Sequence, residues 1–125
     1  MEGFFNQKKD KMAALTLFKE AADEGVVDAQ YRYACALLDK NLKSKLKVNP
    51  KDAVKYIQLA AENGSCPAQF QIGEAYSKGR LGYKQNLKMA ELWYQRAALH
   101  NDKHASIAKE RLKDLKKTKS KWSLN

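Results

Sequence analysis

The side chains with the most obvious potential for chemistry are two histidines and two cysteines. His100 and His104 are four residues apart, a spacing that can place two imidazoles on one face of a helix, where they could share a metal ion. No third ligand accompanies them, and Asn101-Asp102 between them is typical of a helix boundary. Neither cysteine has a plausible base close to it that could activate a thiolate nucleophile. We therefore expect no catalytic residue, no metal site and no cofactor.

The glycines at 79 and 82 are the nearest approach to a phosphate-binding loop. Such a loop follows a β-strand, whereas the residues before Gly79 have the pattern of a helix. We interpret the pair as a turn between two helices. Without a nucleophile, a metal site or a phosphate site, the sequence argues against an enzyme and against a small-molecule substrate.

The helices that must carry these residues form a repeat. Three segments share one pattern of small residues: 11–25, 52–64 and 88–101. Ala14, Ala53 and Ala90 head the pattern, so its periods are 39 residues (14 to 53) and 37 residues (53 to 90). Periods of this length are typical of solenoids built from stacked helix pairs.

One unit carries a family pattern almost completely: Ala68, Ile72, Gly73, Tyr76, Gly79, Gly82, Tyr83, Ala90, Trp93, Tyr94, Ala97 and Ala98. This unit resembles a Sel1-like repeat, a relative of the tetratricopeptide repeat, and the resemblance extends over about residues 10–112. The other units depart from the pattern. Tyr33-Ala34 and Lys109-Glu110 stand where the family has Leu-Gly, and the connection after Leu38 has no glycine turn.

The resemblance implies an all-α fold, a right-handed α/α superhelical solenoid of about six antiparallel helices. We expect a single domain, 1–125, with these parts: an N-terminal half-repeat (10–25), two full repeats (26–64 and 65–101), a C-terminal capping helix (102–118) and a basic tail (119–125). Gly73 in mid-helix costs about 1 kcal/mol relative to alanine, which we attribute to close approach of a neighbouring backbone. Trp93 is expected to be a wedge between repeats.

In related tetratricopeptide repeats the first helix of each pair lines the concave surface. If this carries over, the groove displays eight side chains: Tyr31, Cys35, Leu38, Phe70, Glu74, Ser77, Lys78 and Arg111. Tyr31 and Phe70 are repeat-equivalent aromatic residues that could anchor a ligand, with core packing as the alternative for both. The resemblance thus implies a non-enzymatic adaptor or scaffold that binds a protein or peptide segment in the groove.

The net charge of +10 is concentrated toward the C-terminus. Seven lysines there form a basic patch: Lys103, Lys109, Lys113, Lys116, Lys117, Lys119 and Lys121. Such a patch could attract an acidic protein, or it could dock on nucleic acid or an anionic membrane, which is our alternative function. A solvated face that keeps the end of the repeat stack soluble is the simpler interpretation, and no aromatic side chains are interleaved with the lysines in the manner of a nucleic-acid site.

No apolar run is long enough for a signal peptide or a membrane span. We therefore expect an intracellular, cytoplasmic monomer. Its two cysteines are not repeat-equivalent, so we expect free thiols.

Overall fold

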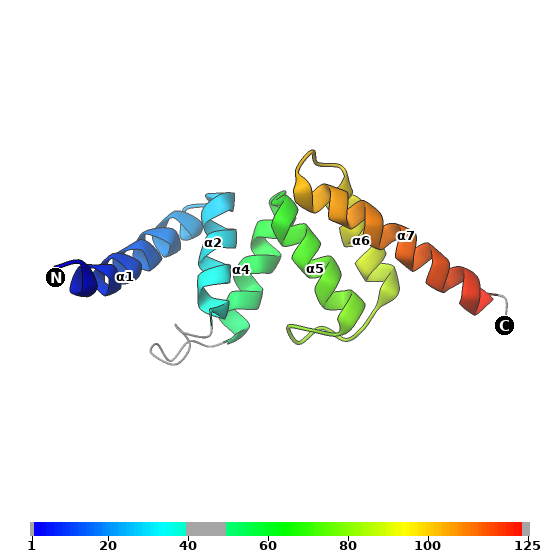
Figure 1. The fold of residues 1–125 in the computed structure, drawn as a ribbon, viewed down its shortest axis with the longest axis horizontal. Coiled ribbons are helices and arrows are strands. Elements are labelled where there is room, and N and C mark those ends of the chain that lie inside the picture. Colours follow the sequence, from blue (N-terminus) through cyan, green and yellow to red (C-terminus); the bar gives the residue numbers. More distant parts are fainter. Residues whose placement is uncertain (1, 40–49, 124–125) are drawn as a thin grey trace. The chain divides into compact units, whose positions relative to one another are not determined.

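The computed structural model describes residues 2–39 and 50–123, and within them the side chains of 13–39 and 51–118. This part of the chain is all-α and contains six helices and no strand: α1 (Glu2–Asp23), α2 (Val27–Leu38), α4 (Pro50–Glu62), α5 (Cys66–Lys78), α6 (Leu87–Ala98) and α7 (Lys103–Ser123) (Figure 1). The predicted fold class is confirmed. The lysine-rich connection between α2 and α4 lies outside the described residues.

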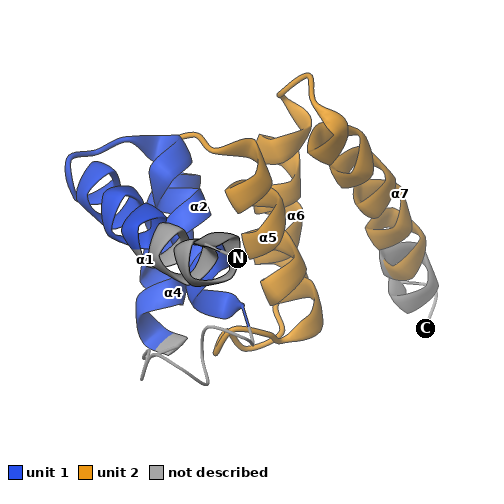
Figure 2. Cartoon of the chain, turned by 60° about the vertical axis from the view of Figure 1, so that its left-hand side comes forward, with its two compact units in different colours: residues 1–63 blue, residues 64–125 orange. Residues whose placement is uncertain are grey.

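The helices group into two compact units, residues 1–63 and 64–125 (Figure 2). In unit 1, α2 packs against both α1 and α4. In unit 2, α6 packs against both α5 and α7, and α5 also contacts α7. Consecutive helices within each unit run in opposite directions (Figure 1), so each unit is a short stack of helical hairpins.

Two repeat-equivalent glycines end α1 and α4. Gly25 and Gly64 both adopt a φ of +98°, a left-handed conformation that a side chain would disfavour. After α1, the N–H of Gly25 donates to the carbonyl of Ala22 and the N–H of Val26 to that of Ala21. These bonds satisfy carbonyls that the helix end leaves without a partner.

Helix starts follow short-range signals as well. Pro50 is the first residue of α4, where its missing N–H costs no helical hydrogen bond. The side chains of Ser65 and Asn86 accept hydrogen bonds from the first turns of α5 and α6. Helix α2 begins without a polar cap residue. The cap position is Val26, and Asp28 lies in the first turn, where it pairs with Arg32 at 2.8 Å.

The two terminal helices are longer than predicted. Helix α1 begins at Glu2 and α7 continues to Ser123, through the segment expected to be a tail. The physical reason is that neither 4–24 nor 103–123 contains a glycine or proline that would stop a helix.

Small residues of the repeat lie in the core. Ala53, Ala90 and Ala97 are fully buried, whereas Ala14 and Ala98 are half-buried. Trp93 is also buried, and its indole Nε1 has no hydrogen-bond partner among the described residues. The Arg96 guanidinium lies 4.5 Å from the centre of the Trp93 ring. The position of Trp93 as a wedge between repeats stays a prediction.

Gly73 lies against a side chain of the neighbouring helix. We expected the backbone of that helix to approach it instead. A Cβ added at Gly73 would lie 2.7 Å from Cδ1 and 2.8 Å from Cε1 of Tyr94. Such distances are shorter than real contacts. The glycine therefore allows the Tyr94 ring of α6 to lie directly on the backbone of α5.

Candidate partner-binding site

Glu74 on α5 is a buried carboxylate with three hydrogen-bond donors. Its Oε1 accepts from the Tyr94 hydroxyl at 2.7 Å and from Arg111 Nε at 2.8 Å, and its Oε2 accepts from Lys78 Nζ at 2.8 Å. Burial by itself raises the pKa of Glu74, but the bonds from Lys78, Tyr94 and Arg111 outweigh it and lower the pKa to about 2. The carboxylate is therefore ionised throughout the neutral range.

Each of the three donors comes from a different helix. Lys78 is one turn beyond Glu74 on α5, the spacing at which helical side chains meet. Tyr94 comes from α6, where Gly73 lets its ring approach, and Arg111 comes from α7. Burial and the bond to Glu74 raise the pKa of Tyr94, which keeps its hydroxyl protonated as a donor. One carboxylate thus holds the three helices of unit 2 together.

A pocket of about 430 Å³ lies beside this network. Its lining comes from α5, the connection between α5 and α6, α6 itself and α7: Ser77, Lys78, Gln85, Leu87, Tyr94, Arg111, Asp114, Leu115 and Thr118. The side chains of Lys78 and Arg111 are 44% and 41% exposed, so both remain accessible at its wall. Arg111 uses Nε for Glu74, which leaves its two terminal nitrogens as potential donors to a ligand.

Four of the residues predicted to line a groove come together here, namely Glu74, Ser77, Lys78 and Arg111. Sequence reasoning missed Tyr94 and the residues of α7 around Arg111. Asp114, Leu115 and Thr118 follow Arg111 at three, four and seven residues, so they share its helical face. Helical periodicity applied to Arg111 would have found them.

Phe70 does not line the pocket, and its predicted display to a ligand is wrong. It is only 8% exposed and belongs to the core of unit 2. Its ring centre lies 5.9 Å from that of Tyr94 and 5.8 Å from that of His104. The rings of α6 and α7 cover Phe70, so the alternative of core packing holds for this residue.

The other predicted groove residues lie in unit 1, on one face of α2. Tyr31 and Leu38 are half-buried and Cys35 is exposed. Their spacing of four and three residues places them in one row along the helix. They form a second candidate contact strip, on unit 1.

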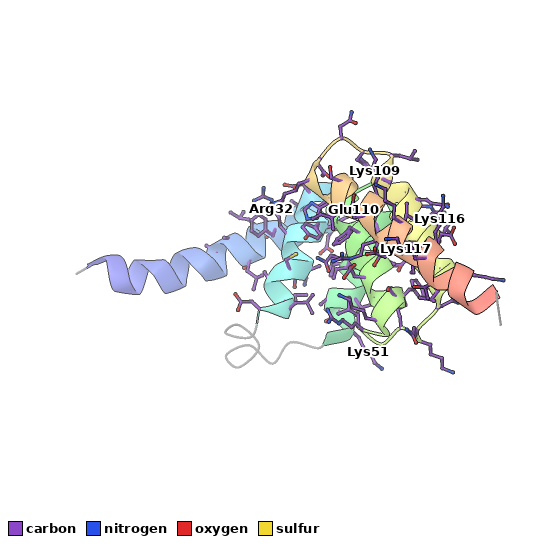
Figure 3. The ribbon with its side chains drawn as sticks, turned by 45° about the vertical axis from the view of Figure 1, so that its right-hand side comes forward. Arg32, Lys51, Lys109, Glu110, Lys116 and Lys117 are labelled. Carbon is purple, nitrogen blue, oxygen red and sulfur yellow. The ribbon has the colours of Figure 1, made fainter. Side chains whose placement is uncertain are left out.

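Five lysines of the predicted basic patch have described side chains, and all five are exposed on α7: Lys103, Lys109, Lys113, Lys116 and Lys117. Figure 3 shows Lys109, Lys116 and Lys117 projecting from this helix. Lys113 lies 3.5 Å from Glu110, an exposed pair worth little energy. Lys119 and Lys121 belong to α7, but their side chains lie outside the described residues.

The residues first considered for chemistry have other contacts. The thiol of Cys66 donates to Asp102 Oδ1 at 3.1 Å, and burial together with this bond raises its pKa to about 12. His100 Nε2 lies 3.2 Å from Gln69 Oε1 and His104 packs beside Phe70. Where side chains are described, no three potential metal ligands converge. None of the helices in that part combines the length and apolarity that crossing a bilayer requires.

Comparison with known proteins identifies the repeat. The family model described as "Sel1 repeat" matches residues 1–26, 27–65 and 66–102. The chain is similar to two proteins described as "DAP3-binding cell death enhancer 1", with 37% identity for the Mus musculus protein and 36% for that of Rattus norvegicus. Each alignment covers 85% of this chain and 19% of the relative, so the chain spans about a fifth of the relatives' length.

A solved structure supports the same assignment. The crystal structure of a Sel1 repeat protein from Oxalobacter formigenes superposes with a TM-score of 0.68 at 31% sequence identity. The match covers 78% of this chain and 68% of the other.

Proposed function

Because this chain belongs to the Sel1 repeat family, we propose that it is a non-enzymatic adaptor that binds a segment of another protein, and that the pocket of unit 2 is where it does so. The observation that carries the proposal is the Glu74 network. It places two half-exposed cations, Lys78 and Arg111, at the wall of a pocket between α5 and α7.

Preorganisation is what makes this pocket suitable for binding. A free lysine or arginine loses rotamer entropy when a ligand fixes it, which weakens binding. Here the buried Glu74 already holds Lys78 Nζ and Arg111 Nε at 2.8 Å. Carbonyl or carboxylate oxygens of a bound segment can then be met by nitrogens that are already in place, while Leu87 and Leu115 offer apolar contact.

The relatives support a protein as the class of ligand. The mouse and rat proteins are named for binding DAP3, and their similarity to this chain includes most of its length. We take from this only that a domain of this kind serves protein binding.

Selection of peptides tests the proposal. Peptides selected from a displayed library on the immobilised full chain are measured again on Thr118→Trp, in which a large ring fills the pocket lining on α7. Gln95→Trp, an exposed substitution on α6 outside the lining, is the matched control. We expect Thr118→Trp to weaken binding by about 2 kcal/mol, as loss of a central contact does, and Gln95→Trp to leave it unchanged. Equal binding to both variants and to the wild type would refute the pocket as the site.

The alternative of docking on nucleic acid or an anionic membrane rests on the α7 lysines. The exposure of these lysines is compatible with such docking. However, Glu110 and Asp114 lie among them, and the described side chains of α7 include no Phe, Tyr or Trp that could stack on bases. Salt titration separates the two classes, because phosphate contacts make affinity fall steeply with salt. We therefore favour protein binding.

A further inference from the structure

Helices α6 and α7 of unit 2 repeat helices α1 and α2 of unit 1. The two periods, 39 and 37 residues, carry Ala14 onto Ala90 and Ala29 onto Ala105. Ala29 and Ala105 are both buried, as equivalent positions should be. In unit 1 the α1–α2 pair is followed by a further helix, α4, which packs against α2, whereas among the described residues no helix follows α7. We therefore compare the face of α2 that contacts α4 with the equivalent face of α7.

In unit 1, α4 contacts both members of the α1–α2 pair. The ring of Tyr56 packs edge-on against Tyr33 of α2, with ring centres 4.8 Å apart and planes at 87°. Its hydroxyl donates to Asp23 Oδ1 at the end of α1, at 2.6 Å. In the next repeat the adjacent positions make the contact: Gly73 of α5, equivalent to Ala34, receives Tyr94 of α6, equivalent to Ile57.

On α7 the equivalent positions carry exposed charges. Lys109 stands at the position of Tyr33 and Ile72, Glu110 at that of Ala34 and Gly73, and Lys113 at that of Leu37 and Tyr76. Leu99 stands at the position of Asp23 and is 86% exposed. Among the described residues, α5 and α6 are the helices that pack on α7, and they do so on its apolar side, with Ala105, Ala108 and Leu115.

Helix α7 also continues beyond the point at which α2 and α5 end. Its extension adds Lys116 and Lys117 to the same outward side. We define the lysine face by Leu99, Lys109, Glu110, Lys113, Lys116 and Lys117. It carries four positive charges against one negative charge, and it is turned away from the pocket, since Arg111, Leu115 and Thr118 occupy other positions around the helix.

We propose that the lysine face docks an acidic amphipathic helix of a partner protein, lying along α7 as α4 lies along α2. The register identifies the shape of the occupant, because the same positions on α2 and α5 receive a helix. The charge identifies its chemistry. Lys109, Lys113 and Lys116 follow each other at four and three residues, so carboxylates spaced by one turn can pair with all three. Leu99 offers an apolar contact that a phosphate backbone would not use.

The test uses the full chain and a labelled helical peptide of about 18 residues, a length at which a designed helix begins to be stable. Glutamates occupy three positions one turn apart, with a leucine on the same face, and binding is followed by fluorescence anisotropy. The reversed variant is Lys109→Glu, Lys113→Glu and Lys116→Glu together. Its matched control reverses three exposed lysines on other elements, Lys55, Lys84 and Lys88. A Lys→Gln version of the first set serves if the reversed variant does not fold.

We expect the reversed variant to bind the acidic peptide about tenfold more weakly than the control variant does, and a peptide with lysines in place of the glutamates to regain that affinity on the reversed variant. Absence of binding to the wild type, equal loss in both variants, or equal binding of a scrambled peptide would overturn the proposal. So would tighter, lysine-dependent binding of a short RNA duplex or of phosphatidylserine vesicles. Since the pocket is a separate surface, none of these results bears on its role.

Discussion

Substituting Gly73 by alanine should destabilise the protein, although the same change in most helices stabilises it. Removing a glycine from a helix interior contributes about 1 kcal/mol in favour of the folded state. In unit 2 the new Cβ would lie 2.7 Å from Cδ1 of Tyr94, so the ring must shift. Tyr94 is 1% exposed and its hydroxyl is held by Glu74 at 2.7 Å, which means that a shift disturbs both the core and the carboxylate.

The expected net effect follows from two opposing terms. Overpacking of a core typically costs about 1–3 kcal/mol, and the helix-propensity gain offsets about 1 kcal/mol of it. We therefore expect Gly73→Ala to lower the free energy of unfolding by up to about 2 kcal/mol, measured by urea denaturation, and Gly73→Leu to lower it further.

A double-mutant cycle isolates the cause. In a Tyr94→Ala background the ring is absent, so Gly73→Ala should become stabilising by about 1 kcal/mol, as helix propensity alone predicts. If Gly73→Ala stabilises the wild type as well, or destabilises both backgrounds equally, the contact between Gly73 and the Tyr94 ring does not explain the glycine.

Three further outcomes are expected. Trp93→Ala should lower the free energy of unfolding by about 3–5 kcal/mol, because this large side chain is buried; an unchanged melting midpoint would contradict that. The pKa of Glu74 is lowered from 4.5 to about 2 in the folded state, so its stabilisation is present above pH 4.5 and is lost as the pH falls toward 2. Wild type should therefore lose more stability over that range than Glu74→Gln, and parallel pH profiles would argue against the network. Thiol labelling at pH 8 should modify exposed Cys35 and spare buried Cys66, whose pKa is about 12, so Cys35→Ser should abolish fast labelling and Cys66→Ser should not.

Helix ends could be predicted where a local signal marks them. Gly25 and Gly64 stop α1 and α4, and Pro50 starts α4, because these residues act through their own backbone conformation. The outer limits of α1 and α7 were missed since the sequence there has no stop signal. A pattern of apolar residues shows which part of a helix is buried, and it does not show how far an exposed end continues.

The candidate site was predicted in part. Placing Ser77, Lys78 and Arg111 on one surface required only the repeat register, and these three residues line one pocket. The same register placed Phe70 on that surface, and it failed there because equivalent positions have different neighbours in different repeats. Tyr31 on α2 is half-buried, whereas His104 and Tyr94 cover Phe70.

The sequence by itself determined the period, the helical class and the family, because spacing along one chain is enough to reveal a pattern that recurs every 37–39 residues. Only the tertiary structure decided which contacts are made by the side chains that differ between repeats. Glu74, for example, accepts hydrogen bonds from Tyr94 and Arg111, which lie 20 and 37 residues away in the sequence and on other helices. The conformation of those side chains depends on how three helices pack. Because side chains from all three fill the interior together at high density, the pattern of any one helix cannot predict the arrangement.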